Sequence, residues 1–360
     1  MPQAVEVIGL AQLGWGADFD QEFQQYARAG LVPGRVAVQH RGAYDVYTVD
    51  GVVRAGLPGR MLHDAADRTE LPAVGDWVAL DGPSQSSPTI KAVLPRRTAF
   101  VRTGASDQHR AGEPQVVAAN VDVIFLVSAL VDDLNLRRLE RYLVLAWESG
   151  AQPVVVLTKA DLCDDVDSLR AEVESVAVGV PVHVVSNVTG EGVEELRPYF
   201  REDRTVGALG SSGVGKSSLI NRLSGNEVAA IGDVRSDGRG RHTTTRRELI
   251  AVPGGGFFLD TPGMRELQLS ETASGVEDAF EDVAAVAAEC RFSDCAHESE
   301  PGCAVREALA CGRLDPERLA SFRKLGRELA ALERKLDARA RSDERKKWRR
   351  FARSRRKASW

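Results

Sequence analysis

A phosphate-binding motif constrains the fold more than any other feature of this chain. Residues 210–217 read Gly-Ser-Ser-Gly-Val-Gly-Lys-Ser and fit the pattern G-x-x-x-x-G-K-[ST]. An apolar run at 205–209 precedes the motif, and a helical pattern at 216–223 follows it. A phosphate loop needs this order, because backbone N–H groups and the helix N-terminus then surround the phosphates. We expect Lys216 to reach the β- and γ-phosphates and Ser217 to hold Mg²⁺; the alternative is a glycine-rich turn that binds nothing.

A second motif selects the base. Residues 158–161 read Thr-Lys-Ala-Asp, follow an apolar run at 153–157 and resemble the guanine-recognition pattern [NT]-K-x-D. Asp161 could accept hydrogen bonds from the N1–H and the exocyclic amine of guanine, and Lys159 would lie over the base plane. Adenine lacks this pair of donors, so a buried carboxylate left unpaired would penalise ATP. A plain turn at the end of a strand is the alternative, and the phosphate loop makes it the weaker one.

Two further segments fit the same site. Asp260-Thr-Pro-Gly263 matches D-x-x-G, so Asp260 would bind Mg²⁺ through water and the Gly263 N–H would sense the γ-phosphate. Ser186-Asn-Val-Thr-Gly190 resembles the loop that supports the base. An ordinary small GTPase carries the phosphate loop and D-x-x-G before its base motif, whereas here the base motif comes first. This order predicts a circular permutation of the same sheet, which places the following domain just after the switch region.

The segments on either side have different patterns. Short alternating runs between 34 and 103, separated by Gly and Pro turns, predict a small all-β barrel or sandwich. Strands that alternate with helices from about 120 onward predict a mainly parallel sheet covered on both faces. After 274 the pattern becomes helical, with a long charged helix expected at 314–340. We therefore expect an N-terminal extension (1–33), a barrel (34–103), an α/β domain (104–273), a helical domain (274–340) and a basic tail (341–360).

Four of the five cysteines lie in the helical region together with a histidine, spaced Cys290-x4-Cys295-x-His297-x5-Cys303. An odd number of cysteines in a chain without a visible leader argues against a disulfide framework. Three thiolates and one imidazole suit a tetrahedral, structural Zn²⁺, one per chain, and leave no open position for hydrolytic chemistry. Two alternatives stay open: Cys311 could replace His297, or the cluster could be reduced and metal-free. We interpret Cys163, beside the base motif, as an ordinary side chain.

The permuted motif order, with a barrel before it and a Cys/His cluster after it, resembles the RsgA (YjeQ) family of small-ribosomal-subunit biogenesis GTPases. The likeness covers roughly residues 34–340. It implies three domains: an all-β OB-fold barrel, a central α/β circularly permuted P-loop GTPase, and a mainly helical zinc-binding domain. It also implies GTP hydrolysis stimulated by the 30S subunit during late maturation. The sequence departs from the family at Thr158, where Asn is the commonest residue; Thr keeps a hydroxyl but loses the amide that helps to brace the guanine site.

The predicted site follows from these motifs. The GTP-binding residues are Thr158, Lys159, Ala160, Asp161, Ser186, Gly210, Ser211, Ser212, Gly213, Val214, Gly215, Lys216, Ser217, Ser218, Thr244, Asp260 and Gly263, with Ser217 and Thr244 also as Mg²⁺ ligands. Thr244 is favoured among the three threonines at 243–245 that would act as a switch. Met264 stands where Ras-like enzymes carry the Gln that positions water. The resemblance suggests His242 as the catalytic substitute, since a neutral imidazole can orient water; the alternative is an exposed loop histidine.

Charge points to a polyanionic partner. The net charge is −5, yet residues 345–360 carry nine Lys or Arg and no Asp or Glu, so the rest of the chain is strongly acidic. A solvated helix end is the alternative. The resemblance makes the partner the 30S subunit and its 16S rRNA, with Trp348 and Phe351 stacking among the basic residues of the tail. Candidate RNA-facing positions of the barrel are Arg35, His40, Arg41, Tyr44, Tyr47, Arg96, Arg97 and Arg102.

The sequence shows no signal peptide and no apolar run long enough to span a bilayer, so we expect a cytoplasmic protein and a monomer. We interpret it as a permuted GTPase that binds the small ribosomal subunit and uses hydrolysis to time its own release. One alternative is a permuted GTPase that acts on the large subunit. Another is an RNA-binding module whose nucleotide site is only structural, and a metalloenzyme is the most distant.

Overall fold

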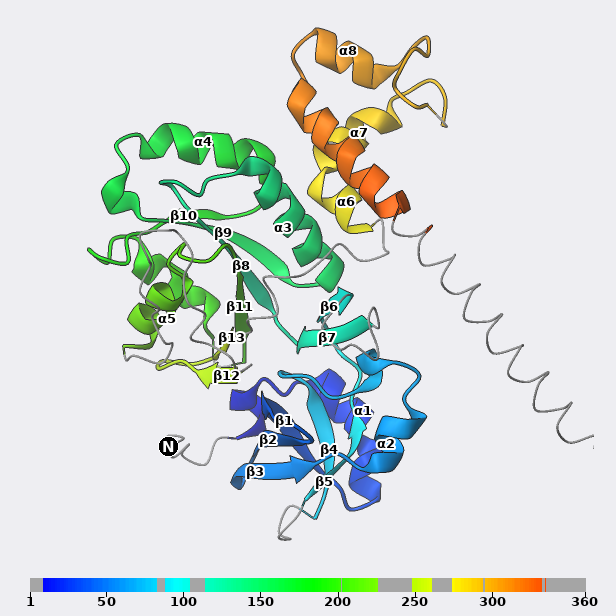
Figure 1. Ribbon diagram of the computed structural model, residues 1–360, viewed down its shortest axis with the longest axis vertical. Helices are drawn as coiled ribbons and strands as arrows, with labels where there is room; N and C mark the ends of the chain where they lie inside the picture. The colour runs from blue at the N-terminus through cyan, green and yellow to red at the C-terminus, as the bar shows by residue number, and fades with distance from the viewer. Residues whose placement is uncertain are drawn as a thin grey trace, which may run out of the picture. The chain divides into compact units, whose positions relative to one another are not determined.

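The chain divides into two units, Met1–Gln268 and Leu269–Trp360, which are described separately. The computed structural model describes residues 9–82, 88–103, 114–201, 203–225, 248–260, 274–293, 295–331 and 334. Figure 1 shows a barrel and an α/β sheet in the first unit and a group of helices in the second. Among the described residues, no helix has the length and apolar character needed to cross a membrane.

Five short strands close into a barrel. They are β1 (Val32–Gln39), β2 (Ala43–Thr48), β3 (Gly51–Gly56), β4 (Trp77–Asp81) and β5 (Thr89–Val93). Their order is β1-β2-β3-β5-β4, and β4 pairs back onto β1. β3 and β5 run parallel, whereas the other neighbours are antiparallel. The closed five-stranded barrel confirms the prediction made for this region.

The N-terminal segment, which the sequence pattern did not assign, folds onto the barrel. The 3-10 helix η1 (Leu10–Leu13) leads into α1 (Ala17–Arg28). Phe19 and Phe23, the buried residues of α1, pack with Trp15 and with Trp77 of β4; the Trp15 and Trp77 rings are 4.6 Å apart in an edge-to-face arrangement. Burial of three aromatic rings, with the half-buried Trp15 packed against them, fixes this otherwise polar helix to the barrel.

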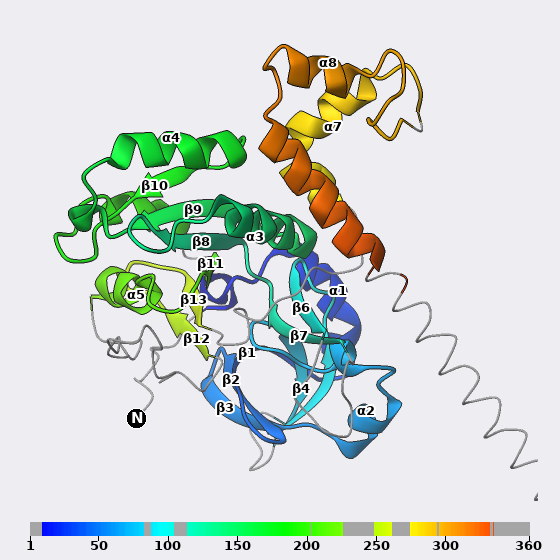
Figure 2. The same cartoon turned by 45° about the horizontal axis from the view of Figure 1, so that its top comes forward.

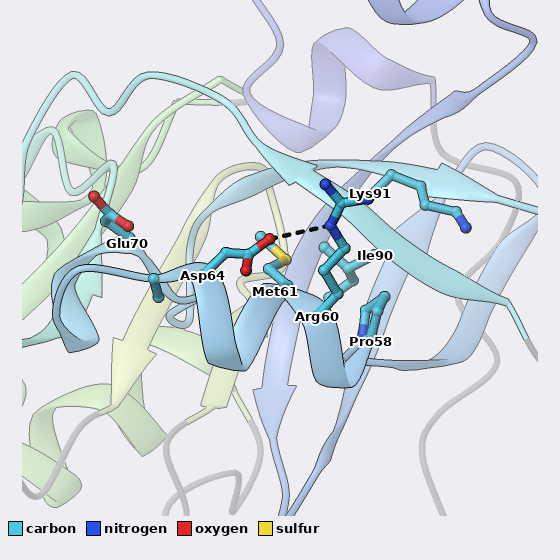
Figure 3. A pocket seen from close by; sticks show the side chains of 8 residues that line it. Pro58, Arg60, Met61, Asp64, Glu70, Ile90 and Lys91 are labelled. Atoms are coloured by element: carbon cyan, nitrogen blue, oxygen red, sulfur yellow. Dashed lines mark hydrogen bonds and ion pairs between the residues drawn. The ribbon is translucent and has the colours of Figure 1, made fainter. Parts of the chain in front are cut away.

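A pocket of about 530 Å³ lies on the barrel between β5 and α2 (Gly59–Asp64), as Figure 3 shows. Met61 and Ile90 provide apolar surface, while Arg60 bonds Asp64 across one turn of α2 at 3.1 Å. A second 3-10 helix, η2 (Arg68–Glu70), follows α2. The pocket shares no residue with the predicted nucleotide motifs.

The α/β part is a six-stranded sheet with strand order β10-β9-β8-β11-β13-β12. The bounds are β8 (Val123–Ala129), β9 (Gln152–Thr158), β10 (Val182–Val184), β11 (Thr205–Leu209), β12 (Glu248–Ala251) and β13 (Phe257–Asp260). Only β12 is antiparallel to its neighbour in this sheet. β8 is buried along its whole length, as a strand covered on both faces must be.

Helices cover both faces of this sheet. In Figure 2, α3 (Leu136–Ser149) and α4 (Val166–Val176) lie on one face, and α5 (Lys216–Ser224) lies on the other with η4 (Val193–Tyr199). A short 3-10 turn, η3 (Ala160–Leu162), follows β9. Asn135 caps α3 by accepting the Arg138 N–H at 3.0 Å, and Gly150 ends it in the left-handed region, so both ends of this helix are defined by local signals.

The barrel and the sheet are joined by hydrogen-bonded strands. β1 pairs with β12 at Val38 and Glu248, so one continuous sheet runs through both. Two strands between them, β6 (Ala99–Thr103) and β7 (Pro114–Ala119), form a separate antiparallel pair. These two strands and β12 were not predicted from the sequence.

The second unit is helical, as predicted. It contains α6 (Ser274–Ala279), α7 (Glu281–Ala288), α8 (Ala304–Ala310) and a helix over 316–331. Arg318 joins them, since its guanidinium donates to Asp282 and to the Ala279 carbonyl at 2.7 Å and lies over the Phe280 ring. The expected helix at 314–340 is observed over 316–331, and most of its remainder lies outside the described residues.

Candidate nucleotide site and metal centre

Four predicted motifs meet at one edge of the sheet. Thr158 is the last residue of β9, Ser186 follows β10, Gly210 follows β11, and Asp260 ends β13. These strands run parallel, so their carboxyl ends lie at the same edge, which is where open α/β sheets bind ligands. The motifs therefore meet in space although their order along the chain is permuted.

The phosphate loop has the backbone that its glycines allow. Gly210, Gly213 and Gly215 have φ values of 155°, 81° and 93°. A Cβ on Gly210 would lie 2.3 Å from the carbonyl oxygen of Val127, so only glycine fits there. The Nζ of Lys216 donates to the carbonyls of Gly210 (2.7 Å) and Ser211. The lysine therefore lies across the loop. When a nucleotide binds, phosphate oxygens would replace these carbonyls as the acceptors of its ammonium group.

Thr158 braces the phosphate loop despite lacking an amide. Its side chain is fully buried, and its hydroxyl donates to the Val214 carbonyl at 2.6 Å. The same hydroxyl lies 3.4 Å from the Ser128 carbonyl, the weaker of the two contacts. Threonine lacks the amide of the commoner asparagine, but its hydroxyl still braces the phosphate loop through the Val214 carbonyl.

Asp161 is oriented by the loop after β10. The Ser186 hydroxyl donates to Asp161 Oδ1 at 2.6 Å and accepts the N–H groups of Val188 (3.2 Å) and Thr189 (3.1 Å). Asp161 is otherwise exposed. Lys159, just before it, has a left-handed backbone with φ of 61°.

Two residues of this site were not predicted. Asn187 donates from Nδ2 to the Gly215 carbonyl at 3.0 Å. Arg222, on α5, donates to the carbonyls of Asn187 (3.1 Å), Val188 (3.3 Å) and Thr189 (3.1 Å). Asn187 stands within the motif at 186–190, but the motif pattern gives weight only to its Ser and Gly. Arg222 carries no motif signal, because its partners come from a different segment of the chain.

Several predicted positions cannot be placed. His242, Thr244 and Gly263 lie outside the described residues, as does the side chain of Asp260. Trp348, Phe351 and the whole basic tail also lie outside them. Their roles stay predictions.

The second unit brings four metal-ligating groups together. Ligand atoms of Cys290, Cys295, His297 and Cys303 lie within 4.8 Å of one another, so they could hold one metal ion. His297 Nδ1 is 3.5 Å from the sulfurs of both Cys290 and Cys303, which are 3.9 Å apart. Cys311 is exposed, lies outside this group and contacts the Ala308 carbonyl, so the alternative ligand set with Cys311 is not favoured.

Glu300 holds the loop that carries the histidine ligand. Its carboxylate accepts the N–H groups of Ala296 (3.0 Å), Glu298 (2.8 Å) and Ser299 (2.9 Å). Backbone N–H groups, its own first, lower the pKa of Glu300 to about 2. Arg323 donates to the His297 carbonyl at 2.8 Å, and His297 has φ of 61°. These contacts position the imidazole beside the thiols.

Comparison with known proteins identifies the family. The family model described as RsgA GTPase matches residues 93–270. The small ribosomal subunit biogenesis GTPase RsgA of Opitutus terrae is 47% identical, over 95% of both chains. The chain belongs to the RsgA GTPase family. The RsgA of Streptomyces coelicolor is 48% identical, over 95% of this chain and 92% of its own.

Solved structures agree with the RsgA fold. The crystal structure of YjeQ from Thermotoga maritima matches with a TM-score of 0.63 and 29% identity, over 83% of this chain and 99% of that one. YloQ, described as a circularly permuted GTPase, matches with a TM-score of 0.60 and 23% identity, over 84% of this chain and 96% of that one. The predicted circular permutation agrees with this fold, and the assignment as a GTPase is confirmed by the family and its curated relatives.

Two barrel residues proposed to face RNA are instead buried in this RsgA-family protein, and two more are half-buried with partners. Arg35 and Tyr44 are 2% and 4% exposed, the Tyr47 hydroxyl donates to the Leu249 carbonyl, and Arg96 pairs with the buried Asp76. For Arg35 and Tyr44 the prediction was wrong, because strand positions of the two faces alternate and a polar residue can point inward with a partner; Tyr47 and Arg96 are half-buried, and for them it stays a prediction. Arg41 is exposed, whereas His40 and Arg97 pair with Asp45 and Asp18.

Arg35 in particular links the barrel to the nucleotide-binding sheet. Its guanidinium donates to the carbonyls of Leu13, Gly75 (3.4 Å) and Asn120 (3.2 Å) and to the Thr205 hydroxyl at 2.6 Å. Burial lowers the pKa of Arg35 to about 10. Thr205 begins β11, the strand that ends at the phosphate loop.

Proposed function

We propose that this chain is a GTPase that binds the 30S ribosomal subunit and acts in its late maturation, with hydrolysis stimulated by the subunit and driving release. One observation carries the proposal: relatives about half identical over nearly the whole chain are named small ribosomal subunit biogenesis GTPases. The basic tail at 345–360 supports contact with the 16S rRNA, and we propose that the protein acts as a monomer.

The nucleotide would bind along the carboxyl edge of the sheet. We assign the phosphates to residues 210–218 and the base to residues 158–161 and Ser186, with Thr244, Asp260 and Gly263 on the γ-phosphate side. Asp161 supports guanine selection because it is exposed and Ser186 orients its carboxylate. A bound base would bury this exposed carboxylate. With adenine, the buried carboxylate would lack a donor, and this would weaken the binding of ATP relative to GTP. Mg²⁺ would be held by Ser217 and Thr244.

The metal centre fits a structural zinc ion, one per chain. A tetrahedral ion with Zn–S near 2.3 Å and Zn–N near 2.0 Å places sulfurs about 3.8 Å apart and sulfur and nitrogen about 3.5 Å apart. The corresponding separations here are 3.9 Å and 3.5 Å. Four protein ligands would complete the coordination, so this site supports the fold and not hydrolysis.

Catalysis would depend on a loop ordered by the partner. We propose that His242 orients the attacking water, as the resemblance implies, since Met264 follows D-x-x-G. We also propose the domain limits expected above, with the barrel at 34–103, the GTPase domain at 104–273 and the zinc domain at 274–340. The switch threonines, within the proposed GTPase domain, and the basic tail both lie outside the described residues.

GTP turnover by the purified protein tests the proposal. It would be measured alone, with 30S particles and with 50S particles, at matched salt, because contacts to rRNA weaken as salt rises. We expect strong stimulation by 30S alone and loss of that stimulation in His242→Ala. Stimulation by 50S instead would overturn the assigned partner. Absence of turnover with either particle would favour a structural nucleotide site.

A further inference from the structure

Two neighbouring carbonyls of the phosphate loop are bound by side chains from two different base-binding loops. The Val214 carbonyl accepts the Thr158 hydroxyl at 2.6 Å, and the Gly215 carbonyl accepts the Asn187 amide at 3.0 Å. Thr158 lies in the base motif after β9, whereas Asn187 lies in the loop after β10. The phosphate loop is thus joined to both loops before any nucleotide contributes.

The amide of Asn187 is closely fitted. A Cβ on Gly215 would lie only 2.7 Å from Asn187 Nδ2, so glycine at that position makes room for the amide. The Oδ1 of Asn187 is buried and has no hydrogen-bond partner among the described residues. A buried acceptor without a partner costs about 1–3 kcal/mol, so stability alone does not explain why the side chain lies here.

Arg222 joins the same loop to α5. Its guanidinium donates to three successive carbonyls, those of residues 187, 188 and 189. Gly190 permits this approach, because a Cβ there would lie 2.1 Å from Arg222 Nη2. Asn187 binds Gly215, just before α5, and Arg222 lies near the end of α5. The loop after β10 is therefore held at both the start and the end of this helix.

We propose that Asn187 and Arg222 are positioning residues that couple guanine recognition to the phosphate loop, and that Asn187 supplies from the second loop the carboxamide that Thr158 lacks in the base motif. The proposal rests on the proposed function, in which these loops bind a guanine nucleotide. Thr158 makes one short hydrogen bond to the phosphate loop, at the Val214 carbonyl, and the Asn187 amide binds the carbonyl of the next residue, Gly215. Asp161 depends on this arrangement, because Ser186, which orients it, directly precedes Asn187.

Affinity for GDP, measured by calorimetry on the full-length protein, tests the role of Asn187. We expect Asn187→Ala to weaken GDP binding about tenfold, the size of a lost hydrogen bond within a buried network. Affinity for inosine diphosphate, which lacks the exocyclic amine, should fall less. The preference for GDP over inosine diphosphate therefore decreases, which general loosening of the fold would not produce.

Return of the amide to the base motif provides a rescue. In the Asn187→Ala background, Thr158→Asn should restore GDP affinity to within about threefold of the parent, since the new carboxamide faces the same loop. Thermal unfolding without nucleotide, compared among the parent and both variants, serves as the control for folding. A drop in unfolding temperature accompanied by equal losses for both nucleotides would make the role merely structural and overturn the proposal.

Arg222 is tested with a matched arginine. We expect Arg222→Ala to weaken GDP binding about fivefold and Arg222→Lys to restore little, because one ammonium cannot span three carbonyls. Arg170→Ala is the control, since Arg170 is an exposed helical arginine that pairs with Glu174 on α4. Equal effects of Arg222→Ala and Arg170→Ala would remove Arg222 from the proposal.

The outcomes separate this proposal from the proposed function. Failure of the parent protein to bind GDP overturns the proposed function itself. Tight GDP binding by the parent and by Asn187→Ala overturns only the coupling. If Asn187→Ala binds GDP weakly and Thr158→Asn does not restore the affinity, the claim that Asn187 supplies the carboxamide missing at Thr158 is overturned.

Discussion

At the scale of single residues, the nucleotide site depends on positions that tolerate no side chain and on short polar contacts. Gly210, at the start of the phosphate loop, faces the backbone of β8, while Thr158 and Asn187 reach the carbonyls of Val214 and Gly215. The glycine can be predicted from the motif, since the loop requires it. The Asn187 contact cannot, because it joins segments 28 residues apart and follows no spacing rule.

Gly210→Ala tests how strictly the loop backbone is constrained. Its Cβ would lie 2.3 Å from the Val127 carbonyl oxygen, and neither backbone can move without displacing β8. We expect a loss of more than about 3 kcal/mol in unfolding free energy and no measurable GDP binding. Gly225→Ala is the control: its φ is 68° and its Cβ would meet nothing within 4 Å, so strain of about 1 kcal/mol is expected. Urea unfolding measures both, and equal losses would contradict the steric argument.

At the scale of elements, the strands and helices that a local sequence pattern defines could be predicted from the sequence. Those that depend on contacts with distant segments of the chain could not. β11 has the predicted bounds because a buried apolar run defines it locally, and α3 is defined in the same way by its capped amphipathic pattern. α1 was not assigned, since its sequence is polar and its burial depends on Trp77, far along the chain. β6 and β7 were missed because strand pairing alone distinguishes them from loops.

The helical unit offers a test of the metal centre with an internal control. Cys290→Ser should reduce bound zinc from about one equivalent to nearly none, because three protein ligands remain and hydroxyl is a poor fourth. Loss of the ion should also reduce protection of α8 from proteolysis, since Cys303 directly precedes this helix. Cys311→Ser should keep the zinc, because Cys311 lies outside the cluster. Metal content by mass spectrometry would decide; zinc retained in Cys290→Ser, or lost in Cys311→Ser, would contradict this ligand set.

At the scale of the whole first unit, the barrel and the nucleotide-binding sheet are not separate pieces. β1 of the barrel pairs with β12, and the Tyr47 hydroxyl bonds the Leu249 carbonyl of that strand. β12 and β13 form the hairpin that ends at Asp260, so the barrel contacts the hairpin that carries the residue we propose on the γ-phosphate side. The sequence predicts the barrel and the sheet individually, but their junction depends on cross-strand register, which no local pattern encodes.

Arg35 bonds segments of both the barrel and the sheet at this junction, and Arg35→Met tests its contribution. Methionine matches the apolar stem but leaves the carbonyls of Leu13 and Asn120 and the Thr205 hydroxyl without their donor. We expect a loss of about 3–5 kcal/mol in unfolding free energy, because buried polar groups would be left unpaired. GDP affinity should fall as well, since Thr205 begins the strand that ends at the phosphate loop. Arg41→Met, at an exposed position on the same barrel, should change neither quantity. Urea unfolding and calorimetric GDP binding measure the two effects, and an Arg35→Met protein as stable as Arg41→Met would show that the barrel and the sheet hold together without this arginine.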